Sequence, residues 1–271
     1  MLTIHNYSKY WLAFIGIGLI ALHLNSSELY SQTASLSHNY LFWTVVLFLL
    51  WEKRSSLPMK SDIASSFAGT VLLSLVLYKS LHLFPGDFFL RIFPLLSLIG
   101  WGLVASGLKE WRHYNKELFL LLFLAIPWEF VYVFDISQLT AQFSNFLLWI
   151  LGFEVTRQSV WIVMPTGSVE VYNGCSGVRT IVQLLGLTWI LLALVPTTWK
   201  QKILLPIASI LLGFTINGMR IALMAVLVAL SNLEGFAYWH TGNGSLVFSA
   251  ISVLIFASMC WFVLYRRKFQ L

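Results

Sequence analysis

The sequence has few charged residues for its length. Aspartate, glutamate, lysine and arginine together make up 10% of the 271 residues, whereas 58% are hydrophobic, and the mean hydropathy is +0.79. Soluble domains carry roughly a quarter charged residues, because water must solvate their surface. The shortage of charge excludes a water-soluble protein, since so much apolar surface needs lipid as its main solvent. The length suits a single integral-membrane domain over residues 1–271.

Cysteine is also scarce, because Cys175 and Cys260 are the only two. Two cysteines exclude a disulfide framework, and Cys260 lies deep in the last apolar run, so we expect no bridge between them. One cysteine and one nearby histidine are too few ligands for a zinc site. We therefore expect no metal and no cofactor. The net charge of +6 comes from short basic clusters between apolar runs, which indicates membrane topology rather than nucleic-acid binding.

Long apolar runs fill most of the chain. A membrane-spanning helix needs about 20 mostly apolar residues, and this rule predicts about eight spans. They cover residues 10–24, 38–51, 63–83, 88–108, 117–134, 175–195, 203–230 and 245–265. No Ala-x-Ala-like cleavage site follows the first run, so we expect it to stay in the protein as an anchor. The predicted fold class is an all-α polytopic membrane protein.

Basic residues occur in every second connection between the predicted spans. These clusters are Lys9; Lys53, Arg54 and Lys60; Lys109, Arg112 and Lys116; Lys200 and Lys202; and Arg266, Arg267 and Lys268. The positive-inside rule then places both termini in the cytoplasm. The segments 25–37, 84–87, 135–174 and 231–244 are expected at the outer face.

The longest outer segment, residues 135–174, divides the domain into N-terminal spans (1–134) and a second group of spans (175–265). Residues 142–153 are predicted to form a short helix along the membrane interface. The following stretch, EVTRQSVWIVMPTGSVEVYN, is rich in valine, isoleucine, tryptophan and threonine. With Pro-Thr-Gly-Ser in its middle, it predicts an extracytoplasmic β-hairpin. The hairpin leads directly to Cys175.

Three reactive side chains are expected at one membrane level. Cys175 begins the sixth span, and His240 lies in the outer loop before the eighth. Arg220 lies about 17 residues from the inner end of the seventh span. At 1.5 Å per residue this is roughly 26 Å, near the outer edge of a ~30 Å hydrocarbon core. Because these spans are consecutive, the thiol, guanidinium and imidazole are expected to share one pocket.

The surroundings predicted for Cys175 suit a nucleophile. A thiol attacks as its thiolate, and a helix N-terminus attracts negative charge. Asn173 and Gly174 allow a sharp turn into the helix, and Arg179, four residues further on, adds positive charge over the same face. His240 exchanges protons near neutral pH. Arg220 offers several donors to an oxyanion or a substrate carboxylate.

Each of these residues also has a purely structural interpretation. Cys175 is then a packing residue at a span end, and His240 a solvated loop residue. Arg220 then extends to the interface, although charged residues inside spans usually mark function. Glu129, near the outer end of the fifth span, either lines the same cavity or is an interfacial carboxylate.

Three classes of function fit these features. One is an enzyme with a nucleophilic cysteine. Another is an anion transporter, because eight spans with an intramembrane arginine suit a carrier, although no inverted repeat or pair of broken helices is evident. The third is a non-enzymatic assembly factor for envelope polysaccharide export.

Three motifs resemble those of the exosortase/archaeosortase family of membrane cysteine proteases. CSGVR contains Cys175 and Arg179, NGMR contains Asn217 and Arg220, and WHTG contains His240. The preceding FLLWILGFEV and GSVEVYNG stretches are also similar, so that the resemblance covers roughly residues 142–265. The aromatic content and the NGCSGVRT stretch look closest to the cyanobacterial branch, the cyanoexosortases.

The resemblance implies that Cys175, Arg220 and His240 are the catalytic residues, with no cofactor. It also implies a location in the bacterial cytoplasmic membrane, with the active site facing the periplasm. The implied substrates are exported proteins with a C-terminal sorting tail: a Pro-Glu-Pro-type motif (PEP-CTERM-like), a transmembrane helix and a basic end. The family is thought to cleave near the motif and to transfer the new C-terminus to an acceptor. TGNGS after His240 departs from the acidic residue more usual there.

Overall fold

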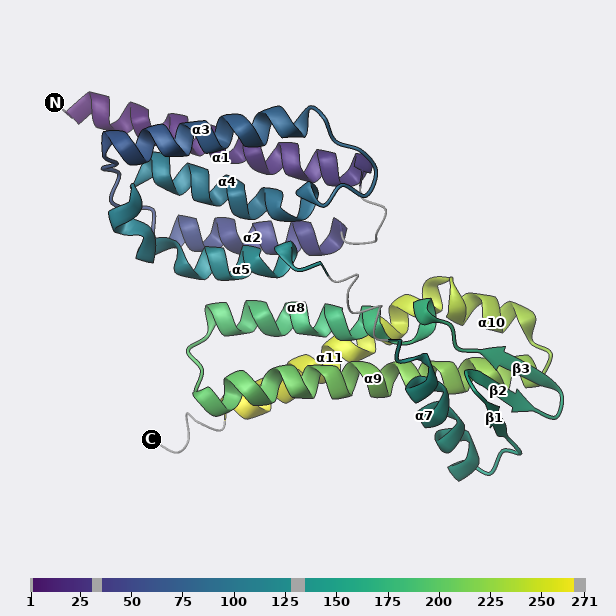
Figure 1. The fold of residues 1–271 in the computed structure, drawn as a ribbon. Helices are drawn as coiled ribbons and strands as arrows, with labels where there is room; N and C mark the ends of the chain where they lie inside the picture. Colours follow the sequence, from purple (N-terminus) through teal and green to yellow (C-terminus); the bar gives the residue numbers. More distant parts are fainter. Residues whose placement is uncertain (1, 31–35, 128–134, 266–271) are drawn as a thin grey trace. The chain divides into compact units, whose positions relative to one another are not determined.

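The structure is a computed structural model that describes residues 2–30, 36–127 and 135–265 (Figure 1). The chain divides into two compact units. The first unit comprises residues 1–127 with 189–195, and the second comprises residues 128–188 with 196–271.

Helices make up the first unit. They are α1 (Leu2–Tyr30), α2 (Leu36–Glu52), α3 (Ile63–Ser80), α4 (Phe89–Ala105), the 3₁₀ helix η1 (Leu108–Tyr114) and α5 (Asn115–Ala125). Glycines let α3 and α4 approach closely, because a Cβ on Gly69 would lie 2.7 Å from the carbonyl oxygen of Gly100. Small residues at a helix crossing are typical of membrane proteins, where close backbone packing replaces the hydrophobic effect as the driving force.

An ion pair joins Lys53, the residue after α2, to a buried carboxylate of α5 in the same unit. The Glu117 side chain is 0% exposed, and the Lys53 Nζ lies 2.7 Å from its Oε1 and 2.8 Å from its Oε2. The lysine also donates to the carbonyl oxygen of His113. A carboxylate at this depth needs such a partner, since desolvation of an unpaired charge is costly.

The second unit combines helices with a small sheet. Its elements are α7 (Ser137–Ile150), β1 (Thr156–Gln158), β2 (Trp161–Met164), β3 (Gly167–Glu170), the 3₁₀ helix η2 (Asn173–Cys175), the part of α8 (Val178–Leu194) up to Thr188, α9 (Trp199–Ala229), α10 (Leu233–His240) and α11 (Asn243–Tyr265). The strands are antiparallel in the order β1-β2-β3. Figure 1 shows the sheet beside the C-terminal part of α9, where the Thr166 hydroxyl donates to the carbonyl oxygen of Ala229.

One apolar cluster connects the sheet, α7 and α9. It contains Ala141, Leu148, Ile162, Met164, Val169, Val171, Cys175, Ile221, Ala222, Met224 and Ala225. The Cys175 side chain is therefore part of a packed core at the edge of the sheet. Helices α8 and α9 lie side by side (Figure 1), and the hydroxyls of Thr188 and Ser209 are 2.5 Å apart between them.

Within the described residues, a helix occupies each of the eight predicted runs. In the part of the chain that the structure describes, four helices are long and apolar enough to cross a membrane: Tyr10–Tyr30, Ile63–Ser80, Trp199–Ala229 and Asn243–Leu264. Two shorter apolar helices are Phe89–Ala105 and Val178–Leu194. The count of eight spans and the cytoplasmic location of both termini stay predictions.

The segment between the two groups of spans differs in detail from its prediction. The β-hairpin is present as β2 and β3, with Pro165 and Thr166 at its turn, but the exposed strand β1 adds a third strand that was not predicted. The expected helix at 142–153 begins earlier, at Ser137. The Asp135 carboxylate accepts a hydrogen bond from the N–H of Ser137 and so satisfies one free donor of the first turn.

Candidate active site

Cys175 lies in a tight turn before α8, not in the first turn of that helix. The Cys175 N–H donates to the carbonyl oxygen of Tyr172 (2.8 Å), and the carbonyl oxygen of Asn173 accepts from the N–H and the hydroxyl of Ser176 (3.1 and 2.7 Å). Gly177 then has φ of +100°, and α8 begins at Val178. The prediction that Cys175 opens the helix is therefore wrong by three residues, because a left-handed glycine separates the turn from the helix.

The cysteine turn is fixed to α9 by Asn217. The side-chain N–H of Asn217 donates to the carbonyl oxygen of Cys175 over 2.8 Å, and Asn217 is buried. A Cβ on Gly177 would lie 2.9 Å from the Asn217 Nδ2. Glycine at position 177 thus supplies both the positive φ and the space that this close approach requires.

Helix α7 supports the same turn from another side. The Thr140 hydroxyl donates to the carbonyl oxygen of Ser176 over 2.7 Å, and the Ser144 hydroxyl donates to the carbonyl oxygen of Gly218 over 2.9 Å. Thr140 and Ser144 are fully buried. These hydrogen bonds place the backbone around Cys175 between α7 and α9.

His240 is delivered by a short helix where a loop was predicted. Helix α10 begins after Asn232, whose side chain accepts from the N–H of Gly235 over 2.8 Å, and it ends at His240. The His240 Nε2 lies 3.2 Å from the Cys175 Sγ. On the same helix, the Phe236 ring lies one turn back and stacks on the imidazole at 5.1 Å between centroids.

Arg220 contacts the backbone at the end of α10. Its Nε donates to the carbonyl oxygen of Trp239 over 3.1 Å, and its Nη2 donates to the carbonyl oxygen of His240 over 2.6 Å. The last carbonyls of a helix have no intrahelical partner and carry partial negative charge. A guanidinium there satisfies two of them and holds the residue that bears the imidazole. The thiol, imidazole and guanidinium predicted to meet are thus brought together.

Tyr172 also belongs to this group, although sequence reasoning gave it no role. Its hydroxyl lies 3.4 Å from the His240 Nε2, and its ring meets the imidazole edge to face at 6.1 Å. The only sequence signal was its position three residues before the cysteine. Neither hydropathy nor the cysteine, arginine and histidine motifs select it.

Two pKa shifts describe the charge state of the site. Burial, followed by the nearby positive charge of Arg220, lowers the pKa of His240 below 6.5. The hydrogen bond with the Cys175 side chain, followed by burial, raises the pKa of Tyr172 above 10. Near neutral pH the imidazole is therefore ready to accept a proton, and the phenol keeps its own.

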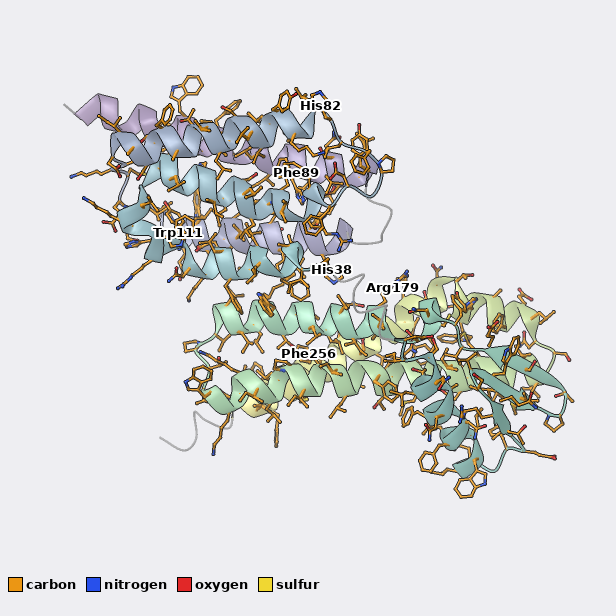
Figure 2. The ribbon with its side chains drawn as sticks, in the orientation of Figure 1. His38, His82, Phe89, Trp111, Arg179 and Phe256 are labelled. Atoms are coloured by element: carbon orange, nitrogen blue, oxygen red, sulfur yellow. The ribbon has the colours of Figure 1, made fainter. Side chains whose placement is uncertain are left out.

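The remaining predicted residues have different surroundings. Arg179 is exposed on the first turn of α8 (Figure 2), and its charge lowers the pKa of Tyr172 in opposition to the effects above. Because Gly177 lies between Cys175 and Arg179, the two do not share a helix face as expected. Asn173 contributes through its backbone carbonyl. Glu129 lies outside the described residues.

The described part of the chain lacks the side-chain clusters that hold metal ions in proteins. No group of three or more histidine, cysteine, aspartate or glutamate side chains there is arranged to hold an ion. The reactive groups that the site itself brings together are a thiol and a neighbouring base. Such a pair is the basis of nucleophilic catalysis by cysteine.

The fold and the site together define a polytopic helical protein with a thiol and an imidazole in contact. A family model described as transmembrane exosortase (Exosortase_EpsH) matches residues 30–257, which include every site residue named above. The chain therefore belongs to the transmembrane exosortase family, as its three motifs predicted. Comparisons with curated proteins and with solved structures gave no match.

Proposed function

We propose that this protein is a membrane-embedded cysteine protease and transpeptidase that cleaves the C-terminal sorting signals of exported proteins. The observation that carries the proposal is the 3.2 Å distance between the Cys175 Sγ and the His240 Nε2, in a chain of the exosortase family. This distance allows direct proton transfer from a nucleophile to its base.

In the proposed mechanism, His240 takes the thiol proton and Cys175 attacks the carbonyl carbon of the scissile peptide. The tetrahedral intermediate collapses to a thioester when the C–N bond breaks and His240 gives its proton to the leaving amine. An acceptor, either water or an amine, then loses a proton to His240 and attacks the thioester. The lowered pKa of His240 supports this role, since a base must be unprotonated before attack.

Arg220 acts in this proposal chiefly as a positioning residue. The sequence assigned it to an oxyanion or to the substrate, but two of its five N–H groups bind the carbonyls of Trp239 and His240. Asn217 has the matching role on the other side, because it binds the carbonyl of Cys175. Both residues extend from α9, so one helix fixes the thiol and the imidazole relative to each other.

The proposed substrates are exported proteins with a sorting tail of the PEP-CTERM type. A transmembrane helix in such a tail would fix the depth of the scissile peptide in the membrane, and this positioning reduces the entropic cost of the reaction. We place the active site at the periplasmic face of the cytoplasmic membrane. The alternating basic clusters support that orientation.

The test is the processing of a tagged sorting-tail protein in cells. Cys175→Ala should insert normally and leave the substrate uncut. Cys260→Ala is the matched control, since it removes the other buried cysteine of the same unit. Processing by Cys175→Ala would exclude the nucleophile. Mass spectrometry of the new C-terminus identifies the acceptor: a free carboxylate indicates hydrolysis, and an added group indicates transfer.

Detection of a thioester at Cys175 separates the enzyme from an anion transporter and from an assembly factor. Only an enzyme of this kind forms a thioester at Cys175, which hydroxylamine cleaves. The geometry of Arg220 also favours the enzyme. An arginine whose N–H groups bind helix-end carbonyls is less available to a transported anion.

A further inference from the structure

The Tyr172 hydroxyl lies against both reacting groups of the site. It is 3.4 Å from the His240 Nε2 and is hydrogen-bonded to the Cys175 side chain. Tyr172 is 50% exposed, whereas Cys175 is 5% exposed. The phenol therefore lies at the border between the buried sulfur and the surroundings from which a peptide must approach.

The local sequence builds this position for the ring. The carbonyl oxygen of Tyr172 accepts from the Cys175 N–H, so the two backbones are fixed relative to each other. A Cβ on Gly174 would lie 2.6 Å from the Cε2 of the Tyr172 ring. Glycine at 174 thus leaves the space in which the ring folds back over the turn. The order Tyr-Asn-Gly-Cys places an aromatic hydroxyl beside the thiol.

When sulfur attacks a peptide carbonyl carbon, the carbonyl oxygen becomes a negatively charged oxyanion. Preorganised donors at that oxygen commonly contribute more to the rate of acyl transfer than any other single effect. Arg220, the donor expected from the sequence, uses its Nε and Nη2 on the end of α10. A neutral donor that already contacts the sulfur is better placed to serve the oxygen.

We propose that Tyr172 is a catalytic residue whose hydroxyl donates a hydrogen bond to the carbonyl oxygen of the scissile peptide and to the oxyanion derived from it. The proposal rests on the proposed function. As the S–C bond forms, the carbonyl electron pair moves onto oxygen, and Tyr172 donates without losing its proton. The pair returns when the C–N bond breaks, and His240 protonates the amine. The raised pKa of Tyr172 keeps the donor protonated throughout.

The test uses Tyr172→Phe in the full-length, membrane-inserted protein, since phenylalanine keeps the ring beside His240 and removes only the hydroxyl. Two rates are measured: cleavage of the tagged substrate, and alkylation of Cys175 by iodoacetamide as a function of pH in a Cys260→Ala background. Loss of one oxyanion donor lowers kcat about 100-fold or more, so cleavage should fall by that factor. Alkylation forms no oxyanion, so its limiting rate at high pH should stay the same.

Tyr238→Phe is the matched control. Tyr238 is 45% exposed and lies on α10, two residues before His240, and the variant should cleave at the wild-type rate. Wild-type cleavage by Tyr172→Phe would overturn the inference alone. An equal fall in the limiting rate of alkylation would also overturn it, because the hydroxyl would then act on the reactivity of the thiol and not on the oxyanion. Processing by Cys175→Ala would instead overturn the proposed function and this inference together.

Discussion

Replacement of Arg220 by lysine separates a positioning role of the guanidinium from a role of its charge alone. Arg220 donates through Nε to the carbonyl of Trp239 and through Nη2 to the carbonyl of His240, at 3.1 and 2.6 Å. Lysine keeps the positive charge but replaces the planar fork by a single ammonium on a flexible stem. It can still bind one of the two carbonyls, but it cannot reproduce the geometry that binds both.

The magnitude follows from the lost hydrogen bond. A hydrogen bond to a charged group contributes about 1.5–3 kcal/mol, and each 1.4 kcal/mol is about tenfold in rate. If this energy holds His240 beside Cys175, Arg220→Lys should lower kcat about 10- to 150-fold. KM should change little, because the lost contact is with the protein and not with the substrate.

The assay is the time course of tagged-substrate cleavage by purified protein in lipid vesicles. Arg157→Lys is the control, because Arg157 also donates to a backbone carbonyl, that of Ser159, but on the exposed strand β1. Wild-type kcat in Arg220→Lys would refute the positioning role and leave charge alone as the contribution of this residue. A large rise in KM with unchanged kcat would instead indicate direct substrate binding.

Three further predictions follow from the same geometry. Gly177→Ala should destabilise the protein by about 1–3 kcal/mol, because alanine would have to adopt a φ of +100° and its Cβ would press against Asn217. An unchanged melting temperature in detergent would contradict this. Cleavage should fall with decreasing pH as His240 gains a proton. The midpoint of the kcat/KM profile should lie below pH 6.5, since burial lowers the pKa of His240. A midpoint above pH 6.5 would argue against a neutral imidazole as the base. Lys53→Met leaves the carboxylate of Glu117 buried without its partner, which should lower the free energy of unfolding by about 3–5 kcal/mol. Adding Glu117→Gln should restore most of the melting temperature. Equal losses in the single and double variants would show that the pair is not coupled.

Hydropathy predicted the helices well because lipid imposes a simple rule on them. A chain in the bilayer must satisfy its backbone hydrogen bonds internally, so each long apolar run becomes a helix. The lengths of the helices were harder to predict, because α2 and α4 have 17 residues each and α5 has 11. Composition alone cannot tell whether such a helix crosses the bilayer or packs within it.

The segment 135–174 was harder to predict because tertiary contacts decide its structure. The valine-rich hairpin showed a clear pattern, but the Thr-Arg-Gln strand β1 is polar and exposed, and it forms because β2 offers it an edge. Helix α10 has only eight residues, which is too short to be stable alone. The Asn232 side chain at its start and Arg220 at its end supply the missing hydrogen bonds.

The roles within the site depend on contacts that residue identity does not reveal. Cysteine, arginine and histidine were singled out for their chemistry, and the structure brings them together. Nothing in the sequence distinguishes an arginine that faces a substrate from one that binds helix-end carbonyls. Tyr172 was missed for a similar reason, since an aromatic residue near a membrane interface is ordinary and only the folded turn places its hydroxyl beside sulfur.

The spacing within NGMR explains how three distant segments meet. Asn217 and Arg220 are three residues apart on α9, so they extend from one face of the helix. Asn217 binds the turn that carries the thiol, and Arg220 binds the end of the helix that carries the imidazole. Between them, Gly218 lets the Phe143 ring of α7 approach and offers its carbonyl to Ser144. A single turn of α9 therefore sets the relative positions of α7, the cysteine turn and α10. This accounts for a thiol and an imidazole 65 residues apart lying within 3.2 Å of each other.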